Sequence, residues 1–177
     1  WRLPGFDDSA WPRAAILYHT RATLVGQRDQ PVRRIMTIKP SSIITTPKGE
    51  TVIDMGQNMV GFVRFAVIGP AGLEVSIDHA EVLDAEGNFY RDNYRNAESR
   101  LTYVLRGQGA ERYEPEFTFF GFRYIRLNNW PCPVKLSDFT GVVIHSDVAV
   151  RAGFECSDER VNQLMQNIFW GQRGNFV

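Results

Sequence analysis

The chain has 177 residues, of which 44% are hydrophobic, and its 20 basic and 20 acidic residues give a formal net charge of zero. A chain of this length can bury one sizeable core, and the lack of any long charged run argues against nucleic acid or an anionic membrane as a partner. No stretch approaches the roughly 18 apolar residues that a membrane-spanning helix needs.

The first 30 residues resemble the end of an element that precedes the main fold. The opening as far as Pro12 is rich in turn residues and aromatic side chains, and residues 14–25 (AAILYHTRATLV) have the composition of a strand. The polar run from Gly26 to Pro31 is typical of a linker. We therefore assign residues 1–30 to the tail of a preceding β domain and its linker.

From Val32 to about Gly153 the sequence predicts short β-strands. Runs rich in Val, Ile, Phe, Tyr and Thr alternate with Gly, Pro, Asn or Asp, and no helical period intervenes. The predicted strands are residues 43–46, 51–54, 61–68, 73–81, 101–106, 117–119, 121–127 and 139–144. This pattern favours an antiparallel β-sandwich of the jelly-roll type over a βαβ fold. Residues 31–153 are accordingly assigned to one β-sandwich domain.

Two of these strands carry further information. Residues 121–127 are apolar or aromatic on both faces, which is typical of a central strand. In residues 73–81, strict alternation places His79 and Glu81 on the apolar face. Such a pair could bind a metal or exchange protons, but a zinc site needs further ligands, and His19 and His145 lie in unrelated segments. We favour a structural role for the pair at the strand end.

Aromatic residues in predicted loops are the candidates for ligand binding. Sugar faces stack on flat rings, and Trp130, Tyr90 and Tyr94 fall between the predicted strands. Ordinary packing is the alternative for each ring. These three residues are the candidate carbohydrate-binding side chains of the sequence.

The sequence offers no clear catalytic or metal-binding motif. Glycosidases need two carboxyl groups that flank a bond, but nothing selects a pair among the available carboxylates, and caps or surface charge explain them. The carboxylates considered are Asp54, Asp78, Glu81, Asp84, Glu114 and Glu116. Cys132 and Cys156 are too few for a disulfide scaffold, although one bridge between them stays open. We expect no catalytic residue, no metal and no cofactor.

After Gly153 the hydrophobic period changes to that of a helix. Ser157 is the predicted N-cap, and the residues that follow it are acidic, as the positive end of a helix dipole favours. An apolar stripe at helical spacing is formed by Val161, Leu164, Met165, Ile168 and Phe169. The stripe lies either on the sandwich or against a helical domain that begins here, and we favour the second. Residues 154–177 are therefore assigned to the first helix of a truncated domain.

Several phrases occur in a distinctive order along the chain. They are DMGQNMVGFVRF, GPAGLEVSIDHAEVLDAEGNFYRDNYRNA, YVLRGQG, YEPEFTFFGFRYIRL and FECSDERVNQLMQNIFWGQRGNFV. In this succession they resemble the bacterial α-L-rhamnosidases of glycoside hydrolase family 78. The opening PGFDDSAWPRA is similar to the end of the domain that precedes the sandwich in those enzymes. The resemblance covers nearly the whole chain.

The resemblance implies a concanavalin-like β-sandwich followed by the entry helix of an (α/α)6-barrel catalytic domain. It also implies a parent enzyme that hydrolyses terminal α-L-rhamnosides with inversion, using carboxyl groups of the barrel. The expected partner of this chain is that helical catalytic domain. The alternative is a carbohydrate-binding module for rhamnosyl glycans. The resemblance leaves open whether the bacterial parent is exported or cytoplasmic.

Overall fold

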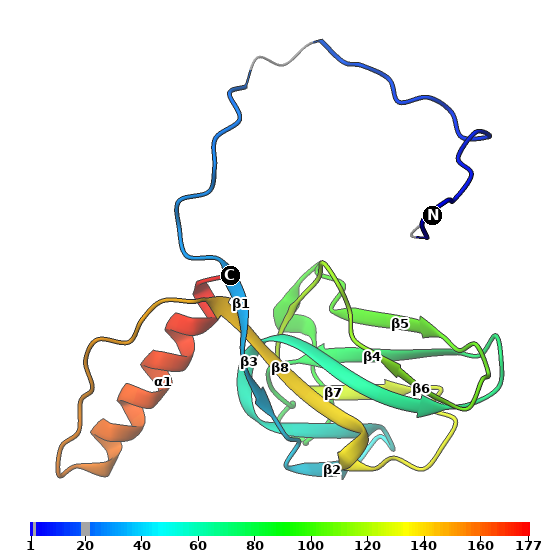
Figure 1. Ribbon diagram of the computed structural model, residues 1–177. Coiled ribbons are helices and arrows are strands. Elements are labelled where there is room, and N and C mark those ends of the chain that lie inside the picture. The colour runs from blue at the N-terminus through cyan, green and yellow to red at the C-terminus, as the bar shows by residue number, and fades with distance from the viewer. Residues whose placement is uncertain (2, 19–21) are drawn as a thin grey trace.

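The structure, a computed structural model, describes residues 1, 3–18 and 22–177, and consists mainly of one curled antiparallel β-sheet with a helix beside it (Figure 1). The elements are β1 (Val32–Ile38), β2 (Ser42–Thr45), β3 (Thr51–Ile68), β4 (Glu74–Ala80), β5 (Arg100–Val104), β6 (Ala110–Tyr113), β7 (Phe120–Asn128), β8 (Phe139–Ser146) and α1 (Glu159–Asn175), with two short 3-10 helices, η1 (Asp92–Tyr94) and η2 (Leu136–Asp138).

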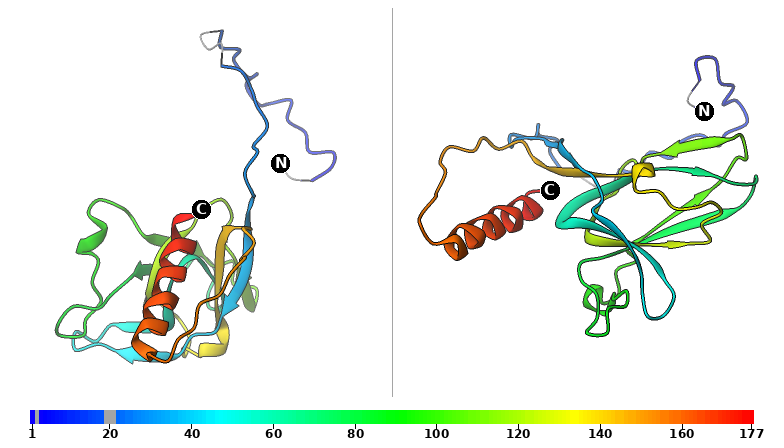
Figure 2. Two further views of the ribbon diagram at one scale, coloured as in Figure 1. Left: turned by 90° about the vertical axis from the view of Figure 1, so that its left-hand side faces the viewer. Right: turned by 90° about the horizontal axis from the view of Figure 1, so that it is seen from below.

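The strands follow the order β1-β8-β3-β7-β4-β5, and β2 and β6 also pair with β3. β3 is therefore shared between two parts of the sheet. Its first residues pair with β2 and β7, and its last residues pair with β8 and β6. The sheet curls around its core as a half-barrel, which the two rotated views show (Figure 2). The predicted mainly antiparallel β fold with a C-terminal helix is confirmed, and β7 lies inside the sheet as expected.

A kink in β3 allows this long strand to serve both parts of the sheet. The pairing between β3 and β7 changes register between Asp54 and Met59, where Gly56 adopts a φ of 78°. An extra residue with positive φ is the usual way to bend a strand and increase its twist. Residues 57–60, which follow the bend, turn toward α1 and line a cavity there.

The core fills the concave side of the sheet. Large buried side chains come from the central strands, among them Ile53, Phe65, Phe122, Ile125 and Phe139. A smaller cluster of Val52, Ala80 and Phe89 lies beside it. Burial of apolar side chains of this size, at roughly 25 cal/mol per Å², is the main force that holds the sheet in its curled form.

The observed strands differ from the prediction in several places. Residues 51–54 and 61–68 belong to one strand, which continues through the kink at Gly56. Residues 117–119 form no strand, since Phe117 has a φ of 60°, which is incompatible with extended pairing. Residues 14–18 and 22–25 form no strand either, and their side chains are exposed. The remaining residues of that predicted strand, including His19, lie outside the described residues.

Helix α1 begins one residue later than predicted. Asp158, not Ser157, is the N-cap, because its carboxylate accepts a hydrogen bond from the backbone N–H of Arg160 at 2.9 Å. The C-terminal part of α1 meets the sheet: the Trp170 ring packs against the core, and the backbone N–H of Ser146 donates to the carbonyl oxygen of Phe176. In the described part of the chain, no helix is both long and apolar enough to cross a membrane.

Candidate functional site

The three aromatic candidates of the sequence do not form one platform. Trp130 packs into the main core, with ring centroids 5.7 Å from Phe65 and 5.3 Å from Phe139. Tyr94 lies in η1 and packs on the smaller cluster, and its hydroxyl donates to the carbonyl oxygen of Gly121 at 2.5 Å. Tyr90 is half-buried in the loop that precedes η1. A sugar-binding role for these residues stays a prediction.

His79, near the end of β4, and Glu81, directly after that strand, have different environments. The His79 ring is fully buried, stacks on Phe120 at a centroid distance of 4.0 Å, and places Nδ1 3.0 Å from the carbonyl oxygen of Ser99. Burial lowers the pKa of His79 to about 4, so the ring is neutral near pH 7. Glu81 is partly exposed at the edge of a cavity. The described residues contain no group of three or more potential metal ligands.

Several carboxylates of the sheet are fixed in ion pairs with arginine. Asp78 is fully buried and accepts from Arg100 at 2.6 Å and from Arg126 at 2.8 Å. Burial alone would raise the pKa of Asp78, but the hydrogen bonds from these arginines and from Asn128 lower it to about 2. The carboxylate of Asp54 is held in the same manner, because it accepts hydrogen bonds from two nitrogens of one arginine. A carboxylate that stays ionised in this way is a poor general acid near neutral pH.

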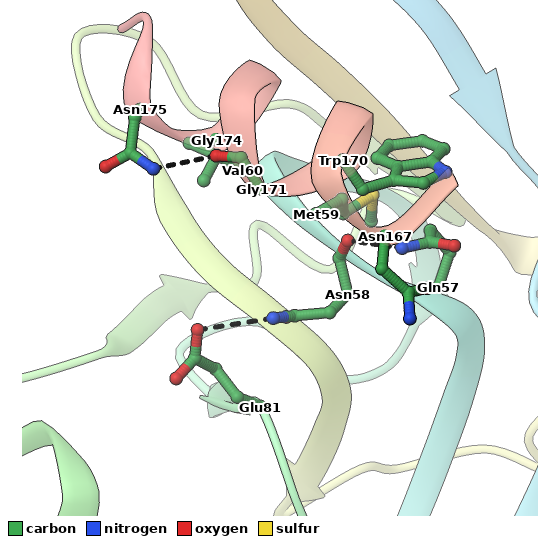
Figure 3. Close-up of a pocket in the computed structure, with 10 residues that line it drawn as sticks. All are labelled: Gln57, Asn58, Met59, Val60, Glu81, Asn167, Trp170, Gly171, Gly174 and Asn175. Carbon is green, nitrogen blue, oxygen red and sulfur yellow. Dashed lines mark hydrogen bonds between the residues drawn. The ribbon is translucent and has the colours of Figure 1, made fainter. Parts of the chain in front are cut away.

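One polar cavity lies between the kink of β3, the end of β4 and helix α1 (Figure 3). Its volume is about 450 Å³, within the range of small-molecule sites. Side chains from all three elements line it, including Gln57, Asn58, Glu81, Asn167, Trp170 and Asn175. The cavity therefore combines amides, one carboxylate and one large aromatic ring.

Hydrogen bonds hold the carboxylate of this cavity in place. Oε1 of Glu81 accepts from Nδ2 of Asn58 at 3.3 Å, and Oε2 accepts from Nδ2 of Asn93 at 3.1 Å. Asn93 belongs to η1, directly before Tyr94, so the loop that carries two of the aromatic candidates also supports Glu81. Burial, together with the negative charge of Glu81, raises the pKa of Tyr94.

The sequence pointed to only one member of this cavity. Glu81 is predicted as a partner of His79, whereas Asn58, Asn167 and Trp170 are not among the predicted site residues. The spacing of Asn167 and Trp170 places them on one face of a helix, which was an available signal. The kink of β3 that brings Asn58 toward them has no comparable signature, because it depends on pairing with strands far away in the sequence.

The side of α1 that turns away from the sheet is apolar and exposed. Val161, Leu164 and Ile168 form this surface, here called the outer face of α1, with exposed fractions of 36%, 55% and 50%. Exposed apolar side chains also occur in the segment that leads into the helix, at Val150 and Phe154. An apolar stripe on one side of a helix normally packs against another element.

Comparison with known proteins gives consistent matches. The family model described as the bacterial α-L-rhamnosidase concanavalin-like domain matches residues 44–145. An α-L-rhamnosidase of Streptomyces avermitilis is 45% identical over 179 residues, which cover 100% of this chain and 17% of that protein. An α-L-rhamnosidase of Alteromonas sp. (strain LOR) is 35% identical, over 99% of this chain and 19% of that protein.

Solved structures agree in fold. The α-L-rhamnosidase from Dictyoglumus thermophilum superposes with a TM-score of 0.91 at 36% identity, over 100% of this chain and 20% of that one. The Streptomyces avermitilis α-L-rhamnosidase, solved in complex with L-rhamnose, gives a TM-score of 0.88 at 43% identity, over 98% and 17% of the two chains. The present chain thus spans a fifth or less of the length of these relatives.

Proposed function

Because this chain belongs to the family of bacterial α-L-rhamnosidase concanavalin-like domains, we propose that it is a non-catalytic domain that braces the helical catalytic domain of a larger α-L-rhamnosidase. The family resemblance of the sequence is confirmed, and the chain corresponds to one part of a longer enzyme. The division into residues 1–30, 31–153 and 154–177 is retained as part of the proposal, and the matched residues 44–145 fall within the second segment.

The outer face of α1 carries this proposal. Trp170 anchors the helix to the sheet, while Leu164 and Ile168 on the other side are half exposed. A helix that is fixed on one side and apolar on the other offers a surface for further helices to pack on. The sheet would then act as a rigid base for a helical domain of the same polypeptide.

The arrangement of carboxylates supports a non-catalytic role. Inverting glycosidases need one carboxylic acid and one carboxylate on opposite sides of the scissile bond. Asp54 and Asp78 are bound by arginines, and Glu114 bridges Arg34 and Arg64. We therefore assign hydrolysis of terminal α-L-rhamnosides, with inversion, to parts of the parent enzyme outside this chain.

The first experiment measures turnover of an aryl α-L-rhamnoside by the 177-residue chain and by the complete parent enzyme. We expect release of the aryl alcohol by the parent only, because Asp54, Asp78 and Glu114 are each held by arginine side chains. Turnover by purified chain at a rate above that of buffer would contradict the non-catalytic role.

The second experiment tests the bracing role with a charge on the outer face of α1. In the isolated chain Leu164→Glu should change the free energy of unfolding by less than about 0.5 kcal/mol, since the side chain is exposed. In the parent enzyme the same change should cost roughly 2 kcal/mol or more, because it places an unpaired charge in an apolar interface. Gln166→Glu, at an exposed polar position of the same helix, is the matched control. Equal effects of the two variants in the parent would contradict the proposal.

The alternative function is capture of rhamnosyl glycans on Trp130, Tyr90 and Tyr94. The positions of the rings favour glycan capture less than the bracing role, because the Trp130 ring packs between rings of the core. Calorimetry with L-rhamnose tests it directly: binding that disappears in Trp130→Ala, while the variant keeps its fold, would support this alternative.

A further inference from the structure

We propose that the cavity between the β3 kink, Glu81 and α1 binds one ring of a neutral sugar or a similar polyol. This site goes beyond the bracing role and does not depend on it. It also differs from the aromatic candidates of the sequence, because its polar groups are amides and a carboxylate that come from β3, the end of β4 and α1 (Figure 3).

The cavity offers unused hydrogen-bonding groups of both kinds. The Asn167 side-chain oxygen accepts from Gln163 at 2.9 Å, and Gln57 donates to the backbone oxygen of Asn58 at 2.8 Å. Within the described part of the chain, the amide nitrogen of Asn167 and the side-chain oxygens of Gln57 and Asn58 then have no protein partner. A sugar hydroxyl both donates and accepts, so neighbouring hydroxyl groups suit a mixed set of this kind.

Glu81 is the group that selects hydroxyl donors. An ionised carboxylate has about four lone-pair positions, and two of them are used by Asn58 and Asn93. The remaining positions can accept from hydroxyl groups of a ligand. Hydrogen bonds to a charged acceptor contribute more than those between neutral groups.

The charge of the cavity favours a neutral ligand. Glu81 is the charged residue among those that line the cavity, and no lysine, arginine or histidine is among them. An anionic ligand would approach a negative charge without compensation. A divalent cation is usually held by more than one carboxylate together with neutral oxygen ligands, whereas Glu81 is the single carboxylate among the lining residues.

Trp170 gives the cavity an apolar wall. Its ring is fixed because it packs against the core on one side, and the guanidinium of Arg173 lies 5.1 Å from the ring centroid. Rigid rings placed beside a few polar groups are typical of sites for small molecules. A sugar ring has an apolar C–H face, which matches the Trp170 ring, and a polar rim, which matches the amides and the carboxylate of the cavity.

Two glycines of α1 keep the cavity open. A Cβ atom at Gly171 would meet nothing within 4 Å, and one at Gly174 would lie 3.2 Å from Cγ2 of Val60. Gly171 lines the cavity, so a larger side chain there would occupy open space at the cavity's edge without meeting the rest of the fold. Replacement of glycine inside a helix also stabilises the helix, by about 1 kcal/mol for alanine.

The test is a titration of the ¹⁵N-labelled 177-residue chain, followed by NMR, with L-rhamnose, D-glucose and sodium D-glucuronate as separate probes. We expect at least one neutral sugar to shift the indole N–H of Trp170 and the side-chain amides of Asn58 and Asn167 in a saturable manner, with a Kd of about 1–10 mM. D-glucuronate should bind at least about tenfold more weakly, because of Glu81.

Two matched variants locate the site. Gly171→Leu should weaken binding at least about tenfold, while Gly171→Ala, which projects only one methyl group, should change it less than about threefold. Neither should lower the midpoint of thermal unfolding. Glu81→Gln keeps the shape of the side chain but removes its charge, and it should weaken binding by about tenfold.

Three results would overturn the proposal. They are the absence of saturable shifts with both neutral sugars at about 50 mM, well above the expected Kd; equal binding by Gly171→Leu and the unmodified chain; and shifts confined to residues around Trp130. If Gly171→Leu fails to fold, Glu81→Gln and the position of the shifted signals decide the question. None of these results bears on the bracing role, which is tested in the parent enzyme.

Discussion

Asp78 is the most enclosed charge of the sheet, and it shows how single residues constrain this fold. Its carboxylate has no exposed surface and contacts Arg91, Arg100 and Arg126. These arginines are themselves partly exposed, so water still solvates the positive side of the cluster. Removal of the carboxylate would leave the guanidinium groups close together with no counter-charge. The loss in folding stability is then larger than the net stabilisation that the ion pairs provide.

We predict that Asp78→Asn lowers the free energy of unfolding by about 2–4 kcal/mol at pH 7, as measured by urea denaturation. The ordinary pKa of 3.8 falls to about 2 in the folded chain. The stabilising contribution of Asp78 is therefore complete above about pH 4 and is lost as the pH falls toward 2.

The pH dependence of this difference gives the sharper test. The gap in stability between the unmodified chain and Asp78→Asn should shrink below pH 4. Glu116→Gln, at an exposed carboxylate, serves as the control and should change stability by less than about 0.5 kcal/mol. A gap that stays constant down to pH 2 would show that the carboxylate is not stabilised as described. Protonation linked to His79 acts at higher pH, between its ordinary value of 6.5 and about 4.

At the scale of elements, the close approach of β3 and β8 depends on a glycine. Gly61 pairs with Val143, and a Cβ atom built at Gly61 would lie 1.9 Å from the carbonyl oxygen of Val142. Since the obstacle is backbone, the two strands would have to separate to admit any side chain. The glycine therefore fixes how tightly the two parts of the sheet are joined.

Gly61→Ala should destabilise the chain by roughly 3 kcal/mol or more in urea denaturation, because overpacking against backbone has no easy relief. Gly171→Ala is the matched control with the opposite sign: its methyl group enters open space, and the helix should gain up to about 1 kcal/mol. If the two substitutions have similar effects, the contact between Gly61 and β8 is looser than described.

Elements with strong internal patterns could be predicted from the sequence, and elements defined by distant partners could not. The alternating residues of β4 and the apolar β7 were recognised, as was the helical period of α1. The strands β1 and β6 were missed: β1 lies at an edge and has an irregular register between Arg34 and Met36, and β6 is only four residues long. Neither presents the regular alternation on which prediction depends.

The candidate site was less predictable than the fold. The aromatic residues were chosen because they fall in loops, yet a loop position does not determine whether a ring faces solvent, as Trp130 shows. The amides of the cavity are common surface residues when taken one at a time. Their significance arises only when the bend of β3 and the docking of α1 bring Asn58 and Asn167 to the same space.

For the molecule as a whole, the N-terminal segment and the sheet differ in how much they contribute to stability. The described residues among the first 18 have exposed side chains, whereas the sheet holds the buried core. Further along the chain, the N–H of Asp147 donates a hydrogen bond to the carbonyl oxygen of Pro31.

Deletion of residues 1–18 should therefore leave the free energy of unfolding within about 0.5 kcal/mol of the original value, because little buried surface is lost. Thermal unfolding of the shortened chain, compared with the original at equal concentration, checks this expectation. A clear fall in stability would show that the segment packs on the β domain in solution.

The course of β3 has a consequence for how the molecule opens. One strand of 18 residues contributes pairing partners to both parts of the sheet, so neither part can detach while the other stays intact. Opening then becomes a single cooperative event, and the amide hydrogens of the paired residues of β3 exchange with solvent only when the entire sheet separates. A backbone cleavage at the kink would divide the chain into two pieces, each lacking strands that the other holds, and neither piece would keep a closed core by itself.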